Sequence, residues 1–130
     1  MENVINGIFI ENNKLLLVKK KKGSVWILPG GKIDNNESHY ETLNREITIE
    51  ELPGLEFKIG ELYDYFKGIS PNNKNKILVF PYFTERLSNK ITPSAEIEEA
   101  KFILYHESNN YNISNVTKTI IESLHNDKYF

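Results

Sequence analysis

Short apolar runs separated by polar turns dominate the chain outside two segments. Residues 4–10 alternate loosely and are rich in β-branched side chains, and residues 15–18 form the continuous apolar run LLLV. Polar residues 11–13 lie between them, so the pair predicts a β-hairpin whose second strand is buried on both faces. Further strands are expected at residues 26–28, within 55–66 in one piece or in two pieces bent at Gly60, at 77–83 and at 101–105.

Two segments have helical periodicity instead. Ser38 with Glu41 three residues later fits a capping box at the start of the first helix. The apolar stripe that faces the core is expected to consist of Tyr40, Leu43 and Ile47. Proline and glycine at 53–54 end this helix near residue 51 or 52. A second helix is expected at 114–125, again with a serine at its start.

This order of elements predicts an α+β fold with a mixed β-sheet between helices. We expect residues 1–130 to form a single domain, because this length supplies one core. No apolar run is long enough to span a membrane, and the N-terminus does not resemble a signal peptide. Zero cysteines exclude disulfides and thiolate chemistry and fit a cytoplasmic location. The net charge of −2 makes duplex nucleic acid an unlikely main partner.

The segment 28–55 contains the strongest chemical signal, a Gly-Gly turn followed by an acidic helix. Glu46 and Glu50 are neighbours at i, i+4 and lie off the apolar stripe. Like charges at this spacing destabilise a helix unless something neutralises them. A divalent Mg²⁺ or Mn²⁺ ion would do so, because hard cations prefer carboxylate oxygens. The alternative is that both glutamates are only solvated, or that Glu46 pairs with a lysine.

The spacing of this segment resembles the Nudix box, G-x5-E-x7-R-E-U-x-E-E-x-G-U, where U is a bulky aliphatic residue. Gly31, Glu37, Arg45-Glu46 and Ile47 match it in register. The preceding WILPGGKI and the acidic segment 96–102 also look like their counterparts in the Nudix family. The resemblance covers most of the chain and implies the Nudix-type α/β/α sandwich.

The resemblance also implies roles for individual residues. The Gly31 carbonyl, Glu46 and Glu50 would hold a divalent metal, Mg²⁺ or Mn²⁺. Glu37 and Arg45 would form a structural pair that fixes the loop against the helix. The metal would polarise a diphosphate and activate a water for attack on phosphorus. The catalytic acids would be Glu46, Glu50 and, from the distal acidic segment, Glu96; the alternative for Glu96 is an ordinary acidic loop.

The second half of the box departs from the pattern. The family has glutamates where this chain has Ile49 and Glu50, and Gly54 comes two residues late. In a regular α-helix, Ile49 would occupy the metal side, and Glu51, about 140° from Glu46, would point beside the core. A one-residue π-bulge would instead return Glu50 and Glu51 to the metal face. We favour the regular helix because π-bulges are rare.

The implied activity is a metal-dependent pyrophosphohydrolase that cleaves a nucleoside diphosphate joined to another moiety. Lys20, within the run of lysines at 19–22, and Lys32 beside the glycine turn are our candidates for substrate contact, although a solvated loop also explains the lysine run. The alternative function is a Nudix-type domain that binds a nucleotide or a protein partner with little or no catalysis, as the loss of a ligand at Ile49 would suggest. The oligomeric state is open, with a homodimer among the alternatives.

Overall fold

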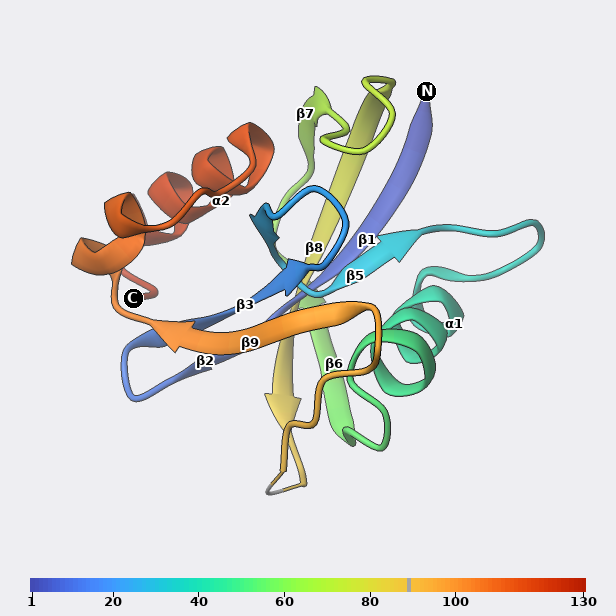
Figure 1. Ribbon diagram of the computed structural model, residues 1–130, viewed down its shortest axis with the longest axis horizontal. Coiled ribbons are helices and arrows are strands. Elements are labelled where there is room, and N and C mark those ends of the chain that lie inside the picture. The colour runs from blue at the N-terminus through green and yellow to red at the C-terminus, as the bar shows by residue number, and fades with distance from the viewer. Residues whose placement is uncertain (89) are drawn as a thin grey trace.

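The computed structural model describes residues 1–88 and 90–130 and places two crossing sheets between helical segments (Figure 1). In chain order the elements are β1 (Glu2–Ile8), β2 (Ile10–Glu11), β3 (Lys14–Lys20), β4 (Trp26–Ile27), β5 (Gly30–Lys32), α1 (His39–Leu43), the π-helix η1 (Asn44–Glu51), β6 (Phe57–Leu62), β7 (Phe66–Ile69), β8 (Lys76–Arg86), β9 (Ile97–Ile103), the 3-10 helix η2 (Tyr105–Asn110) and α2 (Asn115–Asn126). The α+β class and the mixed sheet between helices are confirmed.

The first sheet is mixed and the second is antiparallel. In the first sheet the order is β5-β1-β8-β6, with β7 also paired to β8. Among the strand pairs described in this sheet, β1 and β8 are parallel and the others antiparallel. The predicted strand at 77–83 lies in the middle of the sheet, because β8 pairs with β1 on one side and with β6 and β7 on the other. In the second sheet β3 pairs with β2 and β4 on one side and with β9 on the other. The predicted hairpin of residues 4–10 with 15–18 is correct only for its end, the β2–β3 pair, because residues 4–8 lie in β1 and pair with β5 and β8 in the first sheet.

The central position of β3 explains why its sequence is continuously apolar. Leu15 and Leu17 belong to the core cluster under α2, whereas Leu16 and Val18 belong to the cluster under α1 and η1. All four side chains are fully buried, as predicted. Alternate side chains of a strand point to opposite faces, so a strand between two cores is apolar at every position.

The first helix begins as predicted but differs along its length. The Ser38 hydroxyl caps the helix by accepting from the Glu41 amide, and the Glu41 carboxylate accepts from the Ser38 amide. Tyr40, however, is 52% exposed, so its assignment to the apolar stripe was wrong. The adjacent His39 occupies that side instead, with its ring against Phe80 and its Nδ1 2.8 Å from the Tyr82 hydroxyl.

The segment 55–66 contains two strands, as one of the two predictions had it, with an irregularity in β6 around Gly60 but the separation of the strands further along. The chain leaves the sheet at residues 63–65, between β6 and β7. The register of β6 against β8 shifts between Ile59 and Leu62. Tyr63 then turns toward α2, where its hydroxyl contacts Ser123 at 2.7 Å. The strand thus ends where the chain makes a side-chain contact distant in sequence.

None of the helices in the described ranges has the length and apolar character needed to cross a bilayer. The second helix, α2, begins where the serine at 114 predicted, with that side chain accepting from the Thr117 amide. It packs against β7, where Gly68 has no side chain and Val116 fills the space.

Ile47 and Ile49 provide a matched test of the helix geometry. Ile47 is fully buried and Ile49 is 69% exposed. We expect Ile47→Ala to lower the free energy of unfolding by about 2–5 kcal/mol because it leaves a cavity. Ile49→Ala should change it by about 0.5 kcal/mol or less. Urea denaturation of both variants measures the difference, and equal losses would contradict the helix geometry described here.

Candidate active site

The glycine turn between β4 and β5 is held by a buried asparagine. Asn6 donates from Nδ2 to the carbonyl oxygens of Leu28 and Pro29, at 3.0 and 3.1 Å. Gly30 has a φ of +134°, and a Cβ there would collide with the backbone carbonyl of Ile5. Only glycine fits a position with this φ and so close a backbone neighbour. The turn is therefore a rigid platform beside the helix.

The helix that faces this turn is π-helical over Asn44–Glu51, so the favoured regular helix was wrong and the π alternative holds. The Leu52 amide donates to the Ile47 carbonyl at 2.8 Å, an i→i+5 bond. In this geometry residues five apart lie nearly above one another, as residues four apart do in an α-helix. The two adjacent glutamates of this chain, Glu50 and Glu51, come one residue later than the pair in the Nudix box, and the wider π-helical turn accommodates this one-residue shift.

Glu51 is the residue that the regular-helix interpretation excluded from the site. Its side chain is only 2% exposed, and its Oε1 accepts a hydrogen bond from the Gly30 amide at 2.8 Å. Its Oε2 is buried without a hydrogen-bond partner. Burial raises the pKa of Glu51 to about 8, against the smaller opposing effect of the Gly30 amide. Ile49, expected on the metal side, points to solvent instead.

Arg45 joins the glutamates of the helix to the preceding loop. Its Nε donates to Glu37 at 2.7 Å and its Nη1 to Glu46 at 2.8 Å. The same Nη1 also forms an ion pair with Glu50, five residues along the π-helix. Nη2 donates to the Lys32 carbonyl at 3.0 Å. The expected pair of Glu37 and Arg45 is thus part of a larger network that orients two other carboxylates.

Glu46 lies directly over the glycine turn. A Cβ added at Gly31 would overlap the Glu46 carboxylate, so the absence of a side chain at this position makes room for the carboxylate. Burial raises the pKa of Glu46, while its hydrogen bond with Arg45 has the opposite effect. Glu46 and Glu51, also five residues apart, therefore approach the same turn from one face of the π-helix.

These residues fit a hard divalent cation. The orphaned Oε2 of Glu51 is a buried acceptor directed at no protein group, and carboxylate oxygens are the ligands such ions prefer. In the described ranges no three carboxylate or imidazole side chains already converge as a metal cage. Glu46 and Glu50 are turned toward Arg45 instead. Cation binding would therefore compete with Arg45 for these two carboxylates.

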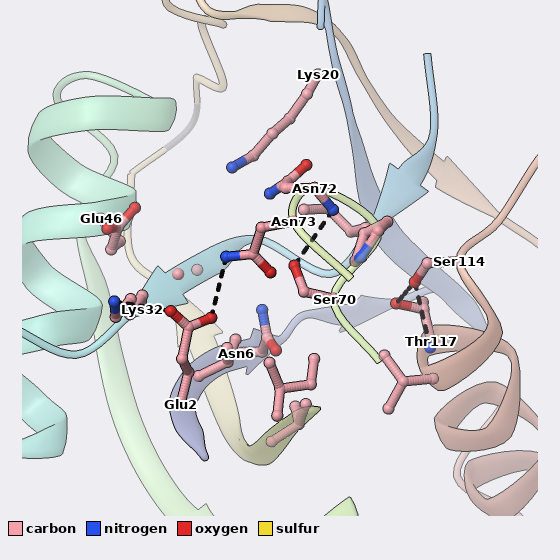
Figure 2. A pocket seen from close by; sticks show the side chains of 18 residues that line it. Glu2, Asn6, Lys20, Lys32, Glu46, Ser70, Asn72, Asn73, Ser114 and Thr117 are labelled. Carbon is pink, nitrogen blue, oxygen red and sulfur yellow. Dashed lines mark hydrogen bonds and ion pairs between the residues drawn. The ribbon is translucent and has the colours of Figure 1, made fainter. Parts of the chain in front are cut away.

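A cavity of about 250 Å³ opens beside the glycine turn (Figure 2). Figure 2 shows Glu46 and Lys32 on one side of it and Ser114 and Thr117 on the other. Its remaining lining mixes polar and apolar side chains: Glu2, Val4, Asn6, Lys20, Ile27, Gly30, Gly31, Ser70, Pro71, Asn72, Asn73, Ile77, Val79 and Val116. Glu46 is thus the helix carboxylate that lines the cavity.

The two lysines expected to contact substrate both line this cavity. The Lys32 ammonium is 2.8 Å from a carboxylate oxygen of Glu2, and Lys20 comes from the end of β3. Glu96 is exposed, and its backbone carbonyl accepts from the Lys21 amide at 3.1 Å. Its side chain is not part of the cavity lining. The structure thus brings together all the expected site residues except Glu96.

Sequence analysis missed three features of the site. The buried amide of Asn6 lies in a strand that reads as apolar. The loop at 70–75 looked like an ordinary polar turn, yet it forms one wall of the cavity. The burial of Glu51 could have been inferred only by accepting the π-helix.

Glu37 offers a test of the Arg45 network through pH. Its hydrogen bond with Arg45, more than any other contact, lowers the pKa of Glu37 to about 2. An acid whose pKa is depressed by folding stabilises the fold above its unfolded pKa of about 4.3 and loses this effect as pH falls toward the folded value. We expect Glu37→Gln to lower the melting temperature at pH 6–7, with the difference from wild type shrinking between about pH 4.5 and 2. A difference independent of pH would contradict this; Glu61→Gln on exposed β6 is the control.

Comparison with known proteins supports the resemblance to the Nudix family. The family model of the NUDIX domain matches residues 2–124. An 8-oxo-dGTP diphosphatase from Buchnera aphidicola subsp. Schizaphis graminum (strain Sg) is 35% identical over 69 residues, which cover 49% of this chain and 53% of that protein. The match therefore spans about half the length of that relative.

Solved structures share the fold across almost the whole chain. The MutT protein from Methanosarcina mazei Go1 superposes with a TM-score of 0.83 at 17% identity, covering 97% of this chain and 94% of that one. The E. coli ORF135 protein superposes with a TM-score of 0.79 at 21% identity, covering 98% and 93%. At these identities the likeness shows the fold alone. The family match over residues 2–124 goes further, and by it the chain belongs to the Nudix family.

Proposed function

We propose that this protein is a pyrophosphohydrolase that depends on Mg²⁺ or Mn²⁺ and cleaves the diphosphate linkage of a nucleoside diphosphate joined to another moiety. One observation carries the proposal: on the π-helix, Glu46 and Glu51 both approach the glycine turn, where Glu46 lines the 250 Å³ cavity and the buried Oε2 of Glu51 has no protein partner. Such a concentration of carboxylates beside a cavity is the arrangement that hard-cation catalysis requires.

The Gly31 carbonyl, Glu46 and Glu50 would hold the cation, and we add Glu51 to this set. When bound, the cation supplies charge neutralisation and Lewis-acid polarisation of the diphosphate. Lys20 and Lys32, which also line the cavity, would bind the phosphate oxygens. Their ammonium groups offset the negative charge that accumulates on the phosphate chain.

A general base must remove a proton from the water that attacks phosphorus. Glu46 is the better candidate for this role, because its half-buried carboxylate lines the cavity and has a raised pKa. Glu50 also pairs with Arg45, but it is more exposed than Glu46 and is not part of the cavity lining. Glu96 remains a weaker candidate, since it is exposed and lies outside the cavity lining. Arg45 would act as the positioning group that orients the two helix carboxylates.

The substrate class follows from the family and from the relative of named activity. The 8-oxo-dGTP diphosphatase of Buchnera acts, by its name, on a nucleoside triphosphate. A triphosphate is a nucleoside diphosphate joined to one further phosphate, so both descriptions share the linkage that would be cleaved. The apolar and polar walls of the cavity suit a nucleoside better than a free phosphate.

The alternative, a binding domain with little or no catalysis, loses its main argument. It rested on Ile49 in place of a glutamate ligand, which would leave the site incomplete in a regular helix. In the π-helix, Ile49 is exposed and Glu51 approaches the glycine turn. Tight nucleotide binding without products and without dependence on metal would favour this alternative.

A hydrolysis screen tests the proposal directly. Nucleoside triphosphates, nucleotide sugars, dinucleotide polyphosphates and ADP-ribose would be incubated with Mg²⁺ or Mn²⁺ at high protein concentration. We expect turnover, and a loss of about 10²-fold in kcat for Glu50→Gln and for Glu51→Gln, the scale of one strong electrostatic contact. The exposed Glu56→Gln is the matched control and should stay within about twofold of wild type. No turnover on any compound would count against the activity, and an unchanged Glu51→Gln would place the site elsewhere.

Gly31→Ala tests the contact between the turn and Glu46. The added methyl group overlaps the Glu46 carboxylate and should displace it, while the free energy of unfolding changes by about 1 kcal/mol or less because the carboxylate end is flexible. We expect at least a tenfold loss of kcat, on the scale of a misplaced catalytic group. Full activity of this variant would show that the observed Glu46 position is not needed for turnover.

A further inference from the structure

Glu2 connects two sides of the cavity mouth. Glu2, Val4 and Asn6 alternate along β1 and line the cavity together. Val4 lies opposite Lys32 in the β1–β5 pair, so Glu2 is the diagonal neighbour of Lys32. Oε2 of Glu2 accepts the Lys32 ammonium at 2.8 Å, and Oε1 accepts from Nδ2 of Asn73 at 3.2 Å (Figure 2).

The backbone and the side chain of Lys32 are held by different partners. Its backbone carbonyl accepts from Arg45 at 3.0 Å, so the main chain is fixed beside the glycine turn. Its side chain is 61% exposed, and among the described residues its ion-pair partner is Glu2. An exposed ion pair of this kind is weak and exchanges readily for another anion. The ammonium is therefore free to move while its backbone stays in place.

We propose that Glu2 is a positioning residue that holds the Lys32 ammonium in the free protein and so competes with the phosphate chain of the ligand for it. The proposal rests on the proposed function, because it takes Lys32 as a phosphate contact. Asn73 keeps the Glu2 carboxylate at the cavity mouth when Lys32 leaves it. Binding of a diphosphate exchanges one anionic partner of Lys32 for another, and Glu2 thereby lowers the affinity of the site for phosphate chains.

Calorimetric titration with inorganic pyrophosphate and Mg²⁺ tests this competition without requiring turnover. Glu2→Gln keeps an acceptor oxygen for Asn73 and removes the charge. We expect it to tighten pyrophosphate binding about threefold, the range of an exposed ion pair. Lys32→Met should weaken binding, and Glu2→Gln should give no further gain in that background. All proteins would carry a C-terminal tag, so that nothing is added next to Glu2.

Two comparisons separate this effect from the general loss of a negative charge. Glu61→Gln removes the same charge from exposed β6 and should leave pyrophosphate binding unchanged. Asn73→Ala releases the Glu2 carboxylate and should act in the same direction as Glu2→Gln, but less. An equal gain in the Lys32→Met background, an equal gain from Glu61→Gln, or no tighter binding by Glu2→Gln would each overturn the proposal.

The kinetic readout distinguishes Glu2 from a structural residue. With a substrate found in the hydrolysis screen, Glu2→Gln should lower KM about threefold and leave kcat within about twofold. A fall in kcat with unchanged KM would overturn the proposed competition. If no compound is hydrolysed but the calorimetric pattern holds, the proposed activity fails and the competition at Lys32 stands.

Discussion

The i→i+5 hydrogen bonding of Asn44–Glu51 determines which carboxylates face the glycine turn. In an α-helix, Glu51 would lie about 140° from Glu46 and point beside the core. In the π-helix the two lie on one face, and Glu50 comes alongside Arg45. The π-helical hydrogen bonds thus bring residues five apart to one face of the helix, as an α-helix does for residues four apart.

This geometry brings negative charges together, and the surrounding groups offset their repulsion. Arg45 is shared by Glu37, Glu46 and Glu50, so one guanidinium neutralises and orients several carboxylates. Glu51 has no guanidinium partner among the described residues; the Gly30 amide donates to it, and the charge of Lys20 also favours its ionised form. A buried carboxyl with an orphaned oxygen is unfavourable for folding, and such groups are concentrated at functional sites. The buried Oε2 of Glu51 therefore marks this turn as a candidate site for a ligand.

Much of the scaffold could be predicted from local patterns. The apolar run of β3, the capping box at Ser38 and the start of α2 each depend on neighbouring residues, and all three are confirmed. The errors occurred where distant contacts decide. Tyr40 is exposed because His39 packs against the sheet in its place, and the break between β6 and β7 follows the contact of Tyr63 with α2.

The sequence by itself determined the family, the glycine turn and the candidate carboxylates, because residue type and spacing are all that a linear motif requires. It could not decide between a regular helix and a π-helix, since both satisfy the same amino-acid pattern between Arg45 and Gly54. Tertiary structure made that choice: Ile47 and Leu52 are buried five residues apart, while Glu51 finds the Gly30 amide across the turn. Contacts between residues distant in sequence, which no local pattern encodes, thus placed Glu51 beside the glycine turn.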